Sequence, residues 1–178
     1  MQVERQDILE LEVDKPVDVI FSTATFHWIM AHERLFERLA RVLKPGGRLV
    51  AQCGGTGNVA RTLAIAEQIM GEDRFRGFFA GWEGAWNFAD PGTTKARLEA
   101  AGFEEIQTWL HEEPTEFASV DELARFLKAV VLRQHLTVLP EQEKDSFAAA
   151  VAGRHAEEGL LVVDYVRLNI LATRSESA

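Results

Sequence analysis

Two stretches decide the fold of this 178-residue chain: residues 17–28, VDVIFSTATFHW, and residues 43–53, LKPGGRLVAQC. The first opens on a nearly continuous apolar run, Val17–Ser22, which is typical of a parallel strand buried on both faces. The second begins with a proline and two glycines, which end a helix and permit a sharp turn. It continues as a second apolar run over Arg48–Cys53, so two neighbouring inner strands are predicted.

The segment between these two strands has the pattern of an amphipathic helix. Within Glu33–Leu43 the apolar residues share one face at helical spacing: Leu35, Phe36, Leu39, Val42 and Leu43. A strand, a helix and a strand in this order require a right-handed crossover and a parallel sheet. The sequence therefore predicts an α/β fold.

The remaining elements follow from the same signals. Helices are expected over residues 58–70, 94–101, 120–132 and 140–156, and strands over 2–6, 103–109 and 160–174. Residues 71–92 are rich in aromatic residues and glycines with weak periodicity, which predicts an irregular insertion containing a short helix.

Composition narrows the class of protein. With 47% hydrophobic and 26% charged residues, residues 1–178 fit a single soluble globular domain. The net charge of −9 and the lack of a Lys/Arg cluster argue against nucleic acid as a partner, and no apolar run is long enough to cross a membrane. Cys53 cannot form an internal disulfide, so a cytoplasmic location is expected. The spacing of the histidines predicts no metal site.

The stretches Asp18–Trp28 and Leu43–Val50 resemble the fourth and fifth conserved blocks of class I S-adenosylmethionine-dependent methyltransferases, closest to the small-molecule branch that includes trans-aconitate methyltransferase. Asp7–Ile8 resembles the acidic block before them, and Thr93–Phe103 the helix and turn before the last strand pair. The resemblance implies a doubly wound, Rossmann-like sheet with strand order 3-2-1-4-5-7-6, mostly parallel with one antiparallel C-terminal strand. It also implies a helical insertion, with residues 71–92 and 111–157 as cap segments.

One departure from the family pattern is large. The family's cofactor site opens with a strand, a Gly-x-Gly loop, a helix and a ribose-binding acid, and nothing before Asp7 has this pattern. Gly54–Gly57 is no substitute, because it follows the strand that corresponds to the fifth and lacks an acid about 20 residues on. We therefore expect an incomplete fold, the C-terminal part of a methyltransferase, which as a truncated chain need not be active.

The resemblance implies S-adenosylmethionine as cofactor and gives roles to six residues. Asp7 and Ile8 would contact the adenine, and Ser22 and Thr23 lie at a strand end beside the topological switch point, where ligands bind in such sheets. His27 and Trp28 would lie over the methionine end, and His27 is a candidate for a general base. The alternatives are that Asp7 is a solvated turn residue and that Trp28 anchors its helix on the sheet.

Two further expectations concern the substrate and the partner. Trp82 and Trp86 are candidates for capping the pocket of a small-molecule substrate, with a carboxylate among the acceptors considered. The alternative is that these rings pack a lid helix onto the core. The Val17–Ser22 strand lacks its neighbour, and unpaired backbone groups favour pairing with another chain. A homo-oligomer through this edge is therefore expected, unless residues 1–12 fold back over it.

Three functions stay open at this stage. The first is methyl transfer to a small molecule by the intact protein. The second is a non-catalytic remnant that acts as an oligomerisation or interaction module. The third, a nicotinamide-dependent oxidoreductase, is disfavoured by the absent dinucleotide fingerprint.

Overall fold

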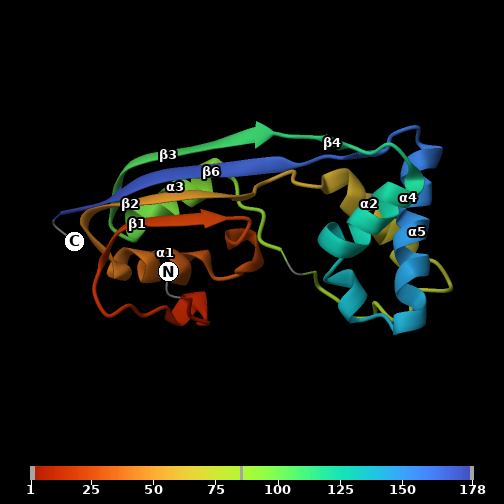
Figure 1. The fold of residues 1–178 in the computed structure, drawn as a ribbon, viewed down its shortest axis with the longest axis horizontal. Helices are drawn as coiled ribbons and strands as arrows, with labels where there is room; N and C mark the ends of the chain where they lie inside the picture. The colour runs from red at the N-terminus through yellow and green to blue at the C-terminus, as the bar shows by residue number, and fades with distance from the viewer. Residues whose placement is uncertain (1–2, 85, 177–178) are drawn as a thin grey trace. The chain divides into compact units, whose positions relative to one another are not determined.

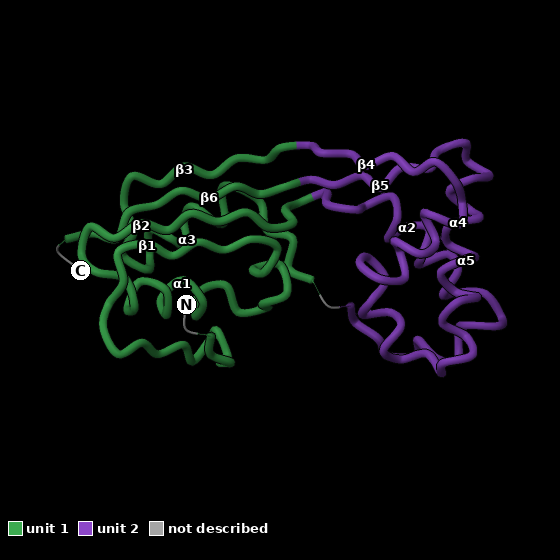
Figure 2. Tube along the Cα trace, in the orientation of Figure 1, with its two compact units in different colours: residues 1–56, 86–111, 167–178 green, residues 57–85, 112–166 purple. Residues whose placement is uncertain are grey.

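The chain divides into two compact units (Figure 2). The structure, a computed structural model, describes residues 3–84 and 86–176. Unit 1 comprises residues 1–56, 86–111 and 167–178, and unit 2 comprises residues 57–85 and 112–166. The composition predicts a single domain, and this stays a prediction. The interpretation of residues 71–92 and 111–157 as cap segments also stays a prediction.

Unit 1 is built on a four-stranded sheet in the order β1-β2-β6-β3 (Figure 1). β1 (Val17–Thr23) runs parallel to β2 (Leu43–Gly54), and β2 runs antiparallel to β6 (Val166–Arg174). β3 (Phe103–Glu112) closes the other side. This is the predicted order of the fourth, fifth, seventh and sixth strands, with the seventh antiparallel, so the predicted fold class is confirmed.

Helix α1 (His32–Val42) connects β1 to β2 and makes the core of unit 1 together with α3 (Pro91–Ala100). The apolar stripe predicted for α1 lies inside, and α3 adds Leu98 to the same cluster. The sheet contributes every second residue of two strands. The cluster on this face includes Leu35, Phe36, Leu39, Leu49, Ala51, Cys53, Leu98, Leu168, Ile170 and Ala172.

The structure corrects the predictions for the first strand and for the start of β2 in unit 1. Residues 3–7 form no strand, and Gln2 lies outside the described residues. Instead the Gln6 side chain bonds the backbone of Glu12 twice, which closes a loop. β2 begins at Leu43 rather than Arg48, because the chain stays extended through Pro45. The predicted turn is replaced by a shift of register between β1 and β2: Val17 is paired with Leu43, but Val19 is paired with Arg48.

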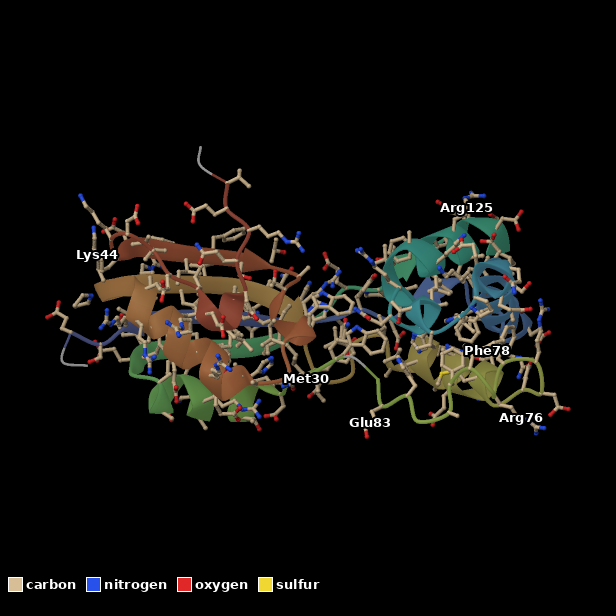
Figure 3. All side chains as sticks on the ribbon, turned by 90° about the horizontal axis from the view of Figure 1, so that it is seen from below. Met30, Lys44, Arg76, Phe78, Glu83 and Arg125 are labelled. Atoms are coloured by element: carbon tan, nitrogen blue, oxygen red, sulfur yellow. The ribbon has the colours of Figure 1, made fainter. Side chains whose placement is uncertain are left out.

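Unit 2 is mainly helical. Its helices are α2 (Ala60–Met70), α4 (Val120–Phe126) and α5 (Glu141–Glu157), with a π-helical turn η3 (Leu127–Val131) and a 3-10 turn η4 (His135–Thr137). A short antiparallel pair, β4 (Thr115–Glu116) and β5 (Val162–Val163), completes it. Arg76 and Arg125 project from its surface (Figure 3). The short helix predicted within residues 71–92 is wrong for the described part of that segment, which forms successive turns up to Trp82.

The single strand predicted over residues 160–174 is broken into β5 and β6. The break falls at Asp164, whose carbonyl accepts from the Val59 N–H and whose carboxylate accepts from the Arg61 N–H at 2.8 Å. These bonds hold the start of α2, where Val59 has a left-handed φ of 49°. Asp164 therefore accepts hydrogen bonds from the start of α2 and does not continue the strand.

None of the helices within residues 3–84 and 86–176 has the length and apolar composition needed to cross a bilayer.

Replacing Leu39 tests the core of unit 1. Leu39 is 1% exposed and packs between α1 and the sheet, so Leu39→Ala should lower the free energy of unfolding by about 2–5 kcal/mol. Urea denaturation followed by circular dichroism measures this. Glu37→Ala, on the exposed side of the same helix, is the control and should stay within about 0.5 kcal/mol of the parent. Equal effects of the two changes would contradict the packing described.

Candidate functional site

The candidate site is the loop that follows β1 in unit 1. In an open α/β sheet, ligands bind beyond the carboxyl ends of the parallel strands, and Ser22 and Thr23 end β1 there, opposite Ala51 and Gln52 of β2. Thr23 is exposed and Ser22 half-buried. Met30 lies beyond this end of the sheet, and Lys44 at the opposite end (Figure 3).

The loop has a strained residue at its start. Ala24 has a φ of 54°, in the left-handed region that costs energy for residues other than glycine. Two hydrogen bonds hold it: its N–H donates to the Gln52 carbonyl at 2.8 Å, and its carbonyl accepts from the Trp28 indole N–H at 3.2 Å. The Trp28 ring is thereby fixed over the loop instead of rotating freely.

His27 is a buried, neutral residue in this structure. Its Nδ1 accepts the N–H of Gly54 at 3.1 Å, so the proton of the neutral ring lies on Nε2. Burial, then the positive charges of Arg167 and His32, lower the His27 pKa to about 4. The ring joins the turn η2 (Phe26–Trp28) to the end of β2. The role of His27 as a general base stays a prediction. Because Nδ1 is already hydrogen-bonded, only Nε2 could take part in proton transfer.

Four aromatic rings gather around this loop. The ring centroids of Trp28 and Trp86 are 6.0 Å apart. The ring of Trp86 stacks on that of Phe88, with the two centroids 6.1 Å apart. His27 completes the group, with its ring 4.9 Å from Trp28 and 5.8 Å from Phe88. We call Trp28, Trp86, Phe88 and His27 the aromatic group. It brings together a turn after β1 and a segment some 60 residues later in the sequence.

Asn87 holds the later segment in place. Its backbone N–H donates to the His27 carbonyl at 2.9 Å and its side-chain amide to the Met30 carbonyl at 3.0 Å. Sequence reasoning missed Asn87, because an asparagine among aromatic residues carries no signal of its partner. The only available hint was its position between Trp86 and Phe88.

Trp82 and Trp86 belong to different compact units. Trp86 belongs to the aromatic group in unit 1, whereas Trp82 lies in unit 2, 4.5 Å from the ring of His135 and 5.8 Å from that of Phe79. Burial lowers the His135 pKa to about 4. Trp82 is thus half-buried against the rings of His135 and Phe79, and its role toward a substrate stays a prediction.

Asp7 and Ile8 lie together at a short 3-10 turn, η1 (Ile8–Glu10). Asp7 caps this turn: its Oδ1 accepts the Leu9 N–H at 2.9 Å, and its side chain is exposed. Ile8 is half-buried against the core that contains α1. The capping bond occupies one carboxylate oxygen of Asp7, and the other is available to a donor.

No group of three side chains able to hold a metal ion occurs within residues 3–84 and 86–176. Cys53 is buried beside the aromatic group, and burial raises the pKa of its thiol to about 11. A thiol in this state is a poor nucleophile and metal ligand.

The buried state of His27 predicts a pH dependence of stability. The unfolded ring takes up a proton near pH 6.5, and the folded ring only near 4. The unfolded state therefore binds more protons in this window, and stability is lost as the pH falls from 6.5 toward 4. His135 acts in the same direction from unit 2. His27→Asn, which keeps an acceptor for Gly54, should reduce this slope.

Urea denaturation across that pH range measures the slope, and proton NMR of the His27 ring measures its pKa. His111→Asn, at an exposed position of β3, is the matched control and should leave the slope unchanged. A His27 ring that titrates near its ordinary value would contradict the burial described.

Comparison with known proteins finds a matching family model and similar relatives. The family described as "Methyltransferase domain" matches residues 1–51. The trans-aconitate 2-methyltransferases of Rhizobium meliloti (strain 1021) and Sinorhizobium medicae (strain WSM419) are 27% and 26% identical to this chain over 182 residues. The match covers 98% of this chain and 70% of each relative.

Solved structures share the fold at low sequence identity. The YcgJ protein of Bacillus subtilis superposes with a TM-score of 0.56 at 13% identity, covering 97% of this chain and 70% of its own. The [4+2]-cyclase SpnF superposes with a TM-score of 0.51 at 19% identity, and the match covers 97% of this chain and 55% of SpnF. A Galdieria sulphuraria protein, provisionally assigned as a sarcosine dimethylglycine methyltransferase, gives 0.50 at 15% identity, covering 96% and 58%.

These matches agree with the order of the strands in unit 1 and with the two sequence blocks at β1 and β2. The chain spans 58% of the Galdieria sulphuraria protein's length. S-adenosylmethionine, the cofactor implied by the resemblance, is supported by the match to the methyltransferase family and to the trans-aconitate 2-methyltransferases. The chain is similar to the class I S-adenosylmethionine-dependent methyltransferases, and among them to the trans-aconitate 2-methyltransferases.

Proposed function

We propose that this chain serves methyl transfer from S-adenosylmethionine to a small-molecule acceptor, and that the acceptor is a carboxylate. The observation that carries the proposal is the loop Thr23–Trp28, held at the carboxyl end of β1 under the aromatic group. Its one histidine is neutral and already accepts a hydrogen bond on Nδ1.

The residues of this chain fit part of the cofactor. The free oxygen of the Asp7 carboxylate suits the amino group of an adenine, and the backbone at Ile8 lies beside it. Ser22 and Thr23 offer hydroxyl groups at the strand end. The face of Trp28 suits a sulfonium, because aromatic faces attract cations. When bound, S-adenosylmethionine supplies an electrophilic methyl group.

Another part of the cofactor has no counterpart in the described residues. Within residues 3–84 and 86–176, no strand followed by a glycine-rich loop precedes β1. The contacts that the family makes there to the ribose and the methionine carboxylate are not supplied by this part of the chain. We therefore infer recognition of the adenine and of the methyl-bearing end, at reduced affinity.

A carboxylate acceptor suits the chemistry of the loop. Carboxylic acids ionise near pH 4, so a carboxylate oxygen is already a nucleophile at neutral pH and no proton has to be removed. The chain's part is then to hold the acceptor in line and to exclude water, which is what a rigid aromatic wall can do. The matched relatives named trans-aconitate 2-methyltransferase support this class of acceptor.

A second candidate function is a non-catalytic interaction module. The observation that favours it is the position of β1 at the edge of the sheet, with its outer side unpaired among the described residues. We also propose a cytoplasmic location, in keeping with the single, buried, free thiol of Cys53.

Cofactor recognition is tested by isothermal titration with S-adenosylhomocysteine. We expect a dissociation constant below about 1 mM, equivalent to about 4 kcal/mol. Asp7→Asn should weaken binding about tenfold, since a bond to a charged acceptor is lost. Asp14→Asn, an equally exposed acid a few residues on, is the control and should bind like the parent. Absence of binding would favour the interaction module.

The acceptor class is tested by transfer of a labelled methyl group. Trans-aconitate and other small di- and tricarboxylates should form monomethyl esters, detected by mass spectrometry, whereas their fully esterified forms should accept nothing. The rate should change little with pH above about 6, because a carboxylate acceptor is ionised throughout this range. Transfer to amines alone would exclude a carboxylate acceptor.

A further inference from the structure

One cavity lies wholly within unit 2, lined by α4, η3, η4 and the first turns of α5. Its volume is about 510 Å³, which is in the range of small-molecule sites. Six charged side chains line it: Arg125, Lys128, Arg133, Glu141, Lys144 and Asp145. Four of these are basic and two acidic, so the cavity has a surplus of positive charge in a chain whose net charge is −9.

Two of the four cations already have a partner. The Lys128 Nζ lies 2.5 Å from a carboxylate oxygen of Asp145, and the Lys144 Nζ lies 2.7 Å from one of Glu141. The guanidinium groups of Arg125 and Arg133 form no hydrogen bond or ion pair with the described residues, 3–84 and 86–176. The surplus charge of the cavity is therefore that of two arginines whose N–H donors are open to a ligand.

The π-helical turn η3 brings these two arginines to one side of their helical run. The Leu132 N–H donates to the Leu127 carbonyl, five residues back, at 2.8 Å, so η3 takes up one residue more than an α-helical turn. In a regular α-helix, residues eight apart point about 80° away from each other, because each residue turns the chain by about 100°. With one residue taken up in η3, this difference falls to about 20°.

Both arginines consequently line the same cavity, Arg125 before the π turn and Arg133 after it. Two helical turns separate them, about 11 Å along the axis, and their side chains are long enough to converge on one ligand. Turns of the π type are rare and are frequent at functional sites. The turn therefore has a consequence here that a regular helix would not give.

The chemistry of the cavity suits a small molecule with two negative charges. A guanidinium group presents a fork of N–H donors that matches the oxygens of a carboxylate or a phosphate. Ala129 and Leu136 add an apolar part to the lining, against which a carbon skeleton can pack. Because Lys128 and Lys144 are neutralised by their carboxylate partners, the cavity balances two ligand charges rather than four.

We propose that this cavity binds a small organic dianion whose charges lie on oxyanion groups, with Arg125 and Arg133 as its charged contacts. Phosphate esters and dicarboxylates share this chemistry, and the choice of probes separates them. This goes beyond methyl transfer, and it rests on the geometry of unit 2 alone.

Calorimetric titration of the full chain tests the site. The probes are glycerol 3-phosphate for phosphate esters and succinate for dicarboxylates, with acetate as the singly charged control. We expect at least one dianion to bind with a dissociation constant below about 1 mM, at least tenfold more tightly than acetate, and more weakly as salt is added. The dianion that binds more tightly identifies the class of ligand.

Charge variants locate the binding. Arg125→Gln and Arg133→Gln should each weaken dianion binding about tenfold, because a bond to a charged group is lost. Arg76→Gln is the matched control: it removes the same charge from the same unit, but Arg76 lies on another side of it than Arg125 (Figure 3) and pairs with Asp73. It should bind like the parent. All three positions are exposed, so the variants should unfold at the parent's urea concentration.

Filling the cavity tests the site without any change of charge. Ala129→Phe places a ring in the cavity from an exposed position of η3, and it should weaken dianion binding at least tenfold. Ala149→Phe, at an exposed position of α5 outside the lining, should leave binding unchanged.

Four outcomes would overturn the proposal. The first is that neither dianion binds, and the second is that acetate binds as tightly as they do. The third is that Arg76→Gln weakens binding as much as Arg125→Gln, which would show a response to overall charge. The fourth is that Ala129→Phe leaves binding intact. The cofactor titration depends on Asp7 in unit 1, so the two proposals fail separately.

Discussion

The parallel pairing of β1 with β2 is the constraint on which unit 1 depends. Two parallel strands need a crossover, and α1 supplies it on one face only, where Leu35 and Leu39 cover Leu49. The same pairing brings the Thr23–Trp28 loop to the carboxyl end of the sheet. Among residues 3–84 and 86–176, no strand pairs with the outer side of β1. The position of the candidate site thus follows from this one pairing.

Much of unit 1 could be predicted because its signals are local. A six-residue apolar run and a helical stripe define β1 and α1 without knowledge of the rest of the chain. The predicted start of α3, Thr94, lies three residues after the observed start, although the sequence marks it: Asp90 caps the helix by accepting the Thr93 N–H, and Pro91 is its first residue. Capping chemistry is therefore the better guide to the start of this helix.

The rest depends on contacts between segments far apart in the sequence. Trp82 and Trp86 are near neighbours in the chain, yet one packs on His135 and the other on Trp28. No periodicity could separate them, because each ring is placed by its partner. Asp164 interrupts a convincing strand for the same reason, since it bonds the start of α2. Single-residue roles such as that of Asn87 are likewise set by tertiary structure.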